Sequence, residues 1–172
     1  MATTMKLIAK VEVGSGGAAN IDFTSIPGTH DDILVVLSQR NSSAGNAQQY
    51  TVNMSINGVT TNRSWRRLGA YNGNQTYSDS GTSSLVAISP GSGATADTFG
   101  STAIYFPNYA GSTNKSFSVD DVTENNSSVN NSISPLAGLW SSTAAITQLT
   151  FSPGSGNFVQ YTTAQIFGIT KA

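Results

Sequence analysis

Apolar and polar residues alternate with a period of two in several short segments of this chain. Between residues 116 and 120, Phe117 and Val119 are separated by serine and aspartate. This period places successive side chains on opposite faces of a β-strand. The segment follows the apolar run of residues 104–106 and a polar stretch at 108–114. Residues 101–124 therefore predict a β-hairpin.

Further strands are predicted along the rest of the chain. Residues 6–13 alternate, so Leu7, Ala9, Val11 and Val13 are expected on one buried face. The aliphatic run in residues 32–39 predicts a central strand covered on both faces. The remaining predicted strands are residues 20–23, 50–56, 63–71, 85–88, 136–140, 148–152 and 158–169.

Turn signals separate these strands. Asn57-Gly58 is a strong hairpin signal and predicts that residues 50–56 pair with residues 63–71. Residues 73–84 and 125–132 are polar and predict long loops that reach neighbouring chains. Ten or eleven short strands at this spacing predict an all-β fold, a two-sheet antiparallel sandwich that is jelly-roll-like. Residues 1–172 are expected to form a single domain.

Composition narrows the classes of function. Only 10% of the residues are charged, the net charge is −1, and there is no cysteine. Disulfides and cysteine chemistry are thereby excluded, and a nucleic-acid partner is not expected. No apolar run approaches 18 residues, and the first ten residues do not resemble a signal peptide. We therefore expect synthesis in a cytoplasm and no membrane partner.

Residues that carry chemistry are few. His30 is the only histidine; with Asp31 and Asp32 beside it, it could suggest a metal or acid–base site, but it lies in a turn after Pro-Gly. Asp120 and Asp121 are adjacent, so a strand would point them to opposite faces, whereas a hydrolase needs two carboxylates that flank one bond. We expect no catalytic residue, no metal and no cofactor, and a protein that is not an enzyme.

Basic residues concentrate in one short segment. Arg63, Trp65, Arg66 and Arg67 lie within five positions. On a strand, Trp65 and Arg67 share one face and Arg66 takes the other. Tryptophan and arginine are enriched at interface hot spots, so these four residues are the candidate interface. The alternative is an exposed strand whose arginines pair with nearby aspartates.

Four aromatic residues suggest a second kind of surface. Tyr105, Tyr109, Trp140 and Tyr161 would form a sugar-stacking platform if they were exposed together. Aromatic residues at alternate strand positions are more often part of the core, and we expect the core placement here.

Three segments resemble a known group of proteins. IDFTSIPGTHDDILVVLSQR, TFGSTAIYFPNYAGSTNKSFSVDDVTENN and LAGLWSSTAAITQLTFSPGSGNFVQYTTAQIFGI are similar to small β-sandwich virion proteins of tailed bacteriophages, including marine and cyanobacterial phages. The resemblance covers much of the chain. It lies in the overall amino-acid sequence and in the order of the predicted strands, and it includes no catalytic signature.

The resemblance implies a structural protein of a bacteriophage virion, foremost a head decoration or cement protein that bridges and stabilises capsid subunits. Its implied partners are the major capsid protein or other virion proteins and further copies of itself, for example in a homo-trimer. The alternative is a glycan-binding module of a phage tail or tail tip that contacts host polysaccharide.

Overall fold

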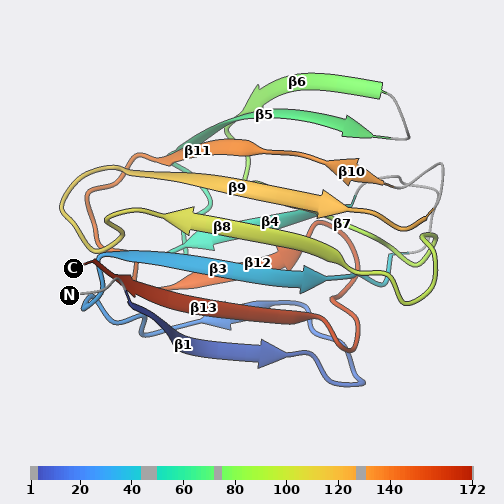
Figure 1. The fold of residues 1–172 in the computed structure, drawn as a ribbon, viewed down its shortest axis with the longest axis horizontal. Helices are drawn as coiled ribbons and strands as arrows, with labels where there is room; N and C mark the ends of the chain where they lie inside the picture. The colour runs from blue at the N-terminus through green and yellow to red at the C-terminus, as the bar shows by residue number, and fades with distance from the viewer. Residues whose placement is uncertain (1–3, 44–49, 72–74, 127–130, 172) are drawn as a thin grey trace.

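The chain folds into two antiparallel β-sheets that pack face to face (Figure 1). The computed structural model describes residues 4–43, 50–71, 75–126 and 131–171, which contain thirteen strands and no helix. The prediction of an all-β, two-sheet antiparallel sandwich is confirmed.

The larger sheet has nine strands. Their spatial order is β1-β13-β3-β8-β9-β10-β5-β11, with β6 paired to β5. β10 and β11 follow each other along the chain, and both pair with β9 and β5, so the sheet is eight positions wide. The bounds are β1 (Thr4–Glu12), β3 (Asp32–Gln39), β5 (Arg63–Tyr71), β6 (Gln75–Gly81), β8 (Gly100–Phe106), β9 (Lys115–Thr123), β10 (Ser132–Ile133), β11 (Leu136–Trp140) and β13 (Thr163–Thr170).

The smaller sheet covers only one face of the larger one. Its four strands, in spatial order, are β2 (Ile21–Phe23), β12 (Leu149–Pro153), β4 (Tyr50–Ile56) and β7 (Leu85–Ser89). They lie behind the middle of the large sheet, and β5 and β6 extend beyond them at one end (Figure 1). We call the covered face of the larger sheet the inner face and the opposite one the outer face.

The predicted hairpin at residues 101–124 is confirmed, because β8 and β9 pair antiparallel across a turn. β3 lies between β13 and β8, as expected for a central strand. Its inner-face residues Ile33, Val35 and Leu37 are at most 1% exposed. Its outer-face residues Leu34 and Val36 are only partly buried. The prediction that this strand is covered on both faces is therefore wrong.

A β-bulge changes the face on which the first strand presents its side chains. The pairing of β1 with β13 shifts register between Leu7 and Ala9. A bulge of this kind inserts one extra residue, so the alternation reverses across it. Ala9 and Val11 face the core, whereas Leu7 lies opposite Phe167 on the outer face and is 48% exposed. The prediction that Leu7 shares the buried face is wrong.

Asn57-Gly58 forms a turn but not the predicted hairpin. Both residues have positive φ, 51° and 76°. The Asn57 amide donates to the Ala145 carbonyl at 2.8 Å and accepts from the Thr147 amide at 2.9 Å. These bonds hold the turn against another loop, and the chain then crosses to the other sheet. β4 and β5 consequently do not pair.

The two predicted long loops also need correction. Residues 75–81 form β6 and pair with β5 along its length, so most of the expected loop at 73–84 is a strand. In the second segment Asn125 and Ser132 are buried, which does not fit a wholly exposed connection. Residues 73–74 and 127–130, which belong to these two predicted loops, lie outside the described residues.

Candidate functional site

β5 carries the predicted arginine and tryptophan cluster, and its alternation separates the four residues. Trp65 and Arg67 lie on the inner-face side, and Arg66 lies on the outer face, as predicted. Arg63 shares the parity of Trp65 and Arg67 and is 5% exposed. The four side chains therefore do not form one exposed patch.

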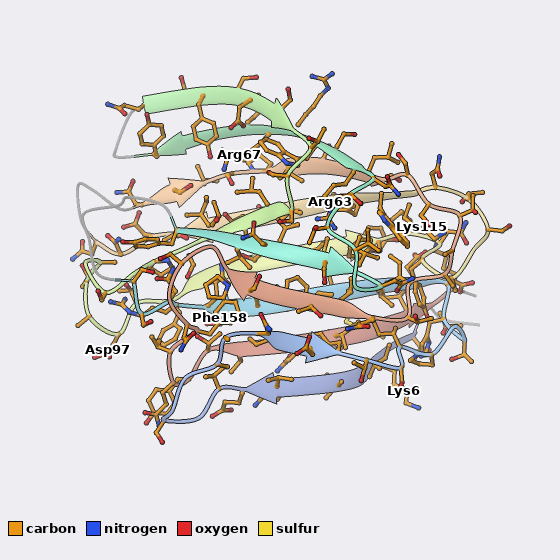
Figure 2. All side chains as sticks on the ribbon, turned by 180° about the vertical axis from the view of Figure 1, so that it is seen from behind. Lys6, Arg63, Arg67, Asp97, Lys115 and Phe158 are labelled. Atoms are coloured by element: carbon orange, nitrogen blue, oxygen red, sulfur yellow. The ribbon has the colours of Figure 1, made fainter. Side chains whose placement is uncertain are left out.

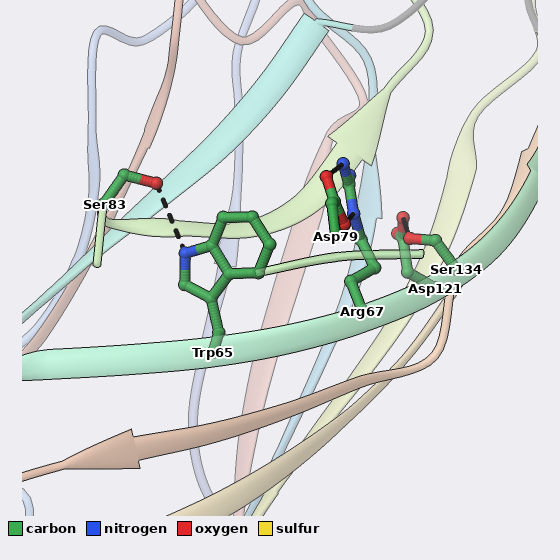
Figure 3. Close-up of polar contacts among 6 residues, drawn as sticks. All are labelled: Trp65, Arg67, Asp79, Ser83, Asp121 and Ser134. Atoms are coloured by element: carbon green, nitrogen blue, oxygen red, sulfur yellow. Dashed lines mark hydrogen bonds and ion pairs between the residues drawn. The ribbon is translucent and has the colours of Figure 1, made fainter. Parts of the chain in front are cut away.

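Arg67 is fixed by partners on β6 (Figure 3). Its Nε and Nη2 donate to the two carboxylate oxygens of Asp79, at 3.0 and 2.7 Å. Its guanidinium also lies 4.7 Å from the centre of the Tyr77 ring and 5.6 Å from that of Trp65. Burial alone would lower the Arg67 pKa, but the Asp79 carboxylate outweighs it and the pKa is raised.

Aromatic rings on this side of the hairpin lie over glycines. Trp65 is directly opposite Gly81, and Tyr77 is directly opposite Gly69. A Cβ placed on either glycine would collide with the facing ring, so each ring packs onto the glycine backbone. The Trp65 indole donates to the Ser83 hydroxyl at 3.3 Å. Together with Arg67, these contacts stabilise the β5–β6 hairpin, which is the structural alternative that the sequence left open.

Arg63 is buried between the sheets with little hydrogen bonding (Figure 2). Its Nη1 donates to the Ser84 carbonyl at 3.4 Å. Among the described residues, its Nε and Nη2 have no hydrogen-bond partner. Burial lowers the Arg63 pKa to about 10. This guanidinium does not reach the surface, so Arg63 cannot serve as an interface contact as predicted.

Arg66 points out of the opposite side of the same strand. It is exposed, and the ion pairs and hydrogen bonds of the described residues do not include its guanidinium. Two shallow grooves of about 610 and 410 Å³ meet at this residue, sharing Arg66, Ser80 and Ala137 as lining. Of the four predicted residues, Arg66 is the one whose charge is available to a ligand or partner.

The two adjacent aspartates point to opposite faces, as predicted. Asp120 is exposed, and Asp121 is fully buried. The Asp121 carboxylate accepts hydrogen bonds from the Thr102 hydroxyl at 2.6 Å and from the Ile88 amide of β7 at 2.9 Å. Burial raises the Asp121 pKa to about 6 despite these bonds. Because Ile88 belongs to the smaller sheet, Asp121 joins the two sheets.

His30 and its neighbours contact the residues at the end of β13. The His30 imidazole Nδ1 is 3.0 Å from the Thr170 hydroxyl. The buried Asp32 carboxylate binds the Lys171 ammonium at 2.8 Å and accepts from the Asn108 amide at 2.9 Å. Burial would raise the Asp32 pKa, but the Lys171, Tyr105 and Asn108 contacts outweigh it and lower the pKa. Among the described residues, no three His, Cys, Asp or Glu side chains are grouped to hold a metal ion.

The predicted aromatic platform does not assemble. Tyr109 and Trp140 are buried in the core, at 0% and 3% exposed, which confirms the core expectation for these two. Tyr105 lies on the outer face and donates to Asp32, and Tyr161 is 64% exposed in a turn. The four rings are therefore divided among three separate surroundings.

The groove at Arg66 has no signature in the sequence, because its walls come from β5, β6, β9 and β11. The alternation of side chains along the strand predicted only that Arg66 lies on the face opposite to that of Trp65 and Arg67. In the part of the chain that the structure describes, no helix is long and apolar enough to cross a membrane. Comparison of the chain with protein-family models, with characterised proteins and with solved structures finds no match.

Proposed function

We propose that this chain is a structural protein of a bacteriophage virion, a head decoration or cement protein that bridges capsid subunits. The observation that carries the proposal is the uncovered outer face of the larger sheet. Leu7, Phe167, Leu34 and Tyr105 lie in register across β1, β13, β3 and β8 on this face. They form an apolar row on a surface that the smaller sheet leaves open.

The chemistry of this face suits contact with another protein. On β13, β3 and β8, the outward positions carry one charged residue, Asp32, and its carboxylate is bound by Lys171. Contact with these strands would therefore desolvate few charges, which keeps the cost of association low.

The size of the face is also adequate. Eight strand positions span about 34 Å, and strands of seven residues are about 23 Å long. The product is close to the roughly 800 Å² that each partner contributes to a standard protein interface. The apolar row crosses four of these eight strand positions, β1, β13, β3 and β8.

Bridging, and not turnover, is the proposed mechanism. Each copy would contribute a modest contact, and many copies on one shell would combine these contacts through multivalency. The proposed partners are the major capsid protein or other virion proteins and further copies of the chain, for example in a trimer. The resemblance of three segments to phage virion proteins points in the same direction.

The test is the location of the chain in purified particles, measured by mass spectrometry and immunogold labelling. We expect many copies per virion, and absence from virions would refute the proposal. Leu7→Glu places a charge on the apolar row and is expected to weaken binding to particles roughly tenfold or more. Ser15→Glu, in an exposed turn outside the row, is the matched control and should bind normally.

A further inference from the structure

The outer face ends in a groove whose chemistry differs from that of the apolar row. The row of paired residues continues from Tyr105 to Ser118, Ala137, Arg66 and Ser80, on β9, β11, β5 and β6. The side chains become small and polar at this end, and the groove lies where they do.

The groove has the size of a small-ligand site. Its two halves are about 610 and 410 Å³ and join at Arg66. Ligand sites in proteins are usually about 300–1,000 Å³. One end is lined by Leu68, which is 62% exposed, and by Pro135. The other end is lined by Leu139 and by part of Trp65.

The groove carries one positive charge that the protein does not neutralise. Its charged lining consists of Arg66, Arg67 and Asp79. Arg67 and Asp79 neutralise each other through two hydrogen bonds. Arg66 remains, with its planar fork of donors, and this geometry matches the two oxygens of a carboxylate.

Hydroxyl groups surround this charge. Ser80 and Ser118 lie in the same cross-strand row as Arg66, and Ser78 and Ser64 line the groove beside them. Each hydroxyl both donates and accepts hydrogen bonds. Leu68, Ala137 and Leu139 add apolar surface. Carboxylate, hydroxyl groups and an apolar ring face occur together in a sugar acid.

A peptide strand fits this groove less well. β5 is already paired with β6 on one side and with β11 and β10 on the other. Its backbone groups are therefore occupied, and a peptide cannot add to it as a further strand. Recognition in the groove rests on side chains, which favours a ligand with many hydroxyl groups.

We propose that the groove around Arg66 binds a carboxylate-bearing saccharide, with the Arg66 guanidinium on the carboxylate and the serine hydroxyls on the sugar. This site is distinct from the aromatic platform that the sequence suggested. Its test is separate from that of the assembly proposal, because Arg66 and the groove serines do not belong to the apolar row.

The experiment is an NMR titration of the ¹⁵N-labelled chain with tri-galacturonate, its uncharged methyl ester and a blocked Ser-Asp-Ser peptide. The acid is expected to shift the resonances of the groove residues. The methyl ester and the peptide should bind at least tenfold more weakly. Arg66→Gln should weaken binding of the acid about tenfold or more, as loss of a charge-assisted hydrogen bond does.

Lys6→Gln is the matched control, since it removes one exposed positive charge on β1, at the other edge of the sheet (Figure 2). It should leave binding of the acid unchanged. Equal thermal unfolding of both variants and the unmodified chain would show that the fold is intact. Failure of the acid to bind, equal binding of its ester, tighter binding of the peptide or an unaffected Arg66→Gln variant would each overturn the proposal.

Discussion

The inner and outer faces of the larger sheet are made by the same strands, yet apolar and charged side chains differ in burial and in hydrogen bonding between the two faces. On the inner face, Lys115 is buried and donates to the carbonyls of Gly111 and Thr113 at 2.6 and 2.5 Å. On the outer face, Leu7 is half exposed and Arg66 has a free charge. The inner face is buried within the chain, with Arg63 left short of hydrogen bonds among the described residues, whereas the outer face leaves the side chains of Leu7 and Arg66 exposed to solvent.

Neighbouring leucines on β3 provide the largest expected contrast between the faces. Leu37→Ala should lower the free energy of unfolding by about 2–5 kcal/mol, because it opens a cavity in the core. Leu34→Ala, on the outer face, should cost less than about 1 kcal/mol. Urea denaturation measures both values. Equal losses would mean that the two faces are packed alike and would contradict the contrast.

Asp121 makes stability depend on pH through the inner face. Its pKa is about 6 in the folded chain, above its ordinary value of 3.8. The folded state therefore holds a proton that the unfolded state releases, and its stabilising effect is complete below pH 4 and is lost as pH rises through 6. The free energy of unfolding should fall by on the order of 2–3 kcal/mol from pH 4 to pH 7.

Urea denaturation across this range measures the effect, and an NMR titration of the Asp121 carboxyl carbon gives the pKa directly. The Asp32 pKa is lowered, so its contribution is complete above about pH 5 and is lost as pH falls below that value. Asp121→Asn should lack the slope between pH 4 and pH 7. Unfolding free energies that rise over this interval would show that Asp121 does not control it.

Arg67 and Arg66 test the contrast on a single strand. Arg67→Gln should lower the free energy of unfolding by about 1–2 kcal/mol, since it breaks the double contact with Asp79, which is 40% exposed and partly screened. Arg66→Gln should change it by less than about 0.5 kcal/mol. Thermal unfolding measured calorimetrically distinguishes them, and a larger loss for Arg66→Gln would reverse the assignment.

Substitution of Arg63 is expected to have a small effect on the free energy of unfolding, with the opposite sign. Its guanidinium is buried with two nitrogens that lack partners among the described residues. Arg63→Met fills a similar volume without a charge and should raise the free energy of unfolding by up to about 1 kcal/mol. A loss greater than about 2 kcal/mol would show that the Arg63 guanidinium is stabilised by groups other than the Ser84 carbonyl. Urea denaturation of Arg63→Met and of the unmodified chain measures which of these two changes in the free energy of unfolding occurs.

Much of the fold follows from period-two patterns. The hairpin of β8 and β9 was predicted from the apolar run at residues 104–106 and from the alternation of Phe117 and Val119. The bounds of β5 and β11 were also predicted, β5 as the partner of residues 50–56, with which it does not pair. β6 was missed, since its segment QTYSDSG has one large apolar residue. Its stability comes from Arg67 and from rings over glycines on the partner strand, which only pairing reveals.

Other features depend on contacts between distant segments. The bulge near Ile8 is invisible in a pattern that alternates regularly, and it decides that Leu7 faces outward. The turn at Asn57 is a sound local prediction, but bonds to the loop near Ala145 decide which sheet follows. The alternation of side chains along β5 correctly predicted that Arg66 lies on the other face of the sheet from Trp65 and Arg67. The burial of Arg63 depends on the smaller sheet and could not be predicted from β5 alone.

The proposed bridging role is tested most directly by a cryo-electron microscopy map of the assembled virion at side-chain resolution. We expect Leu7, Phe167, Leu34 and Tyr105 to lie against a neighbouring virion protein or a second copy of this chain. A virion in which the chain is present but this apolar row faces solvent would refute the bridging role.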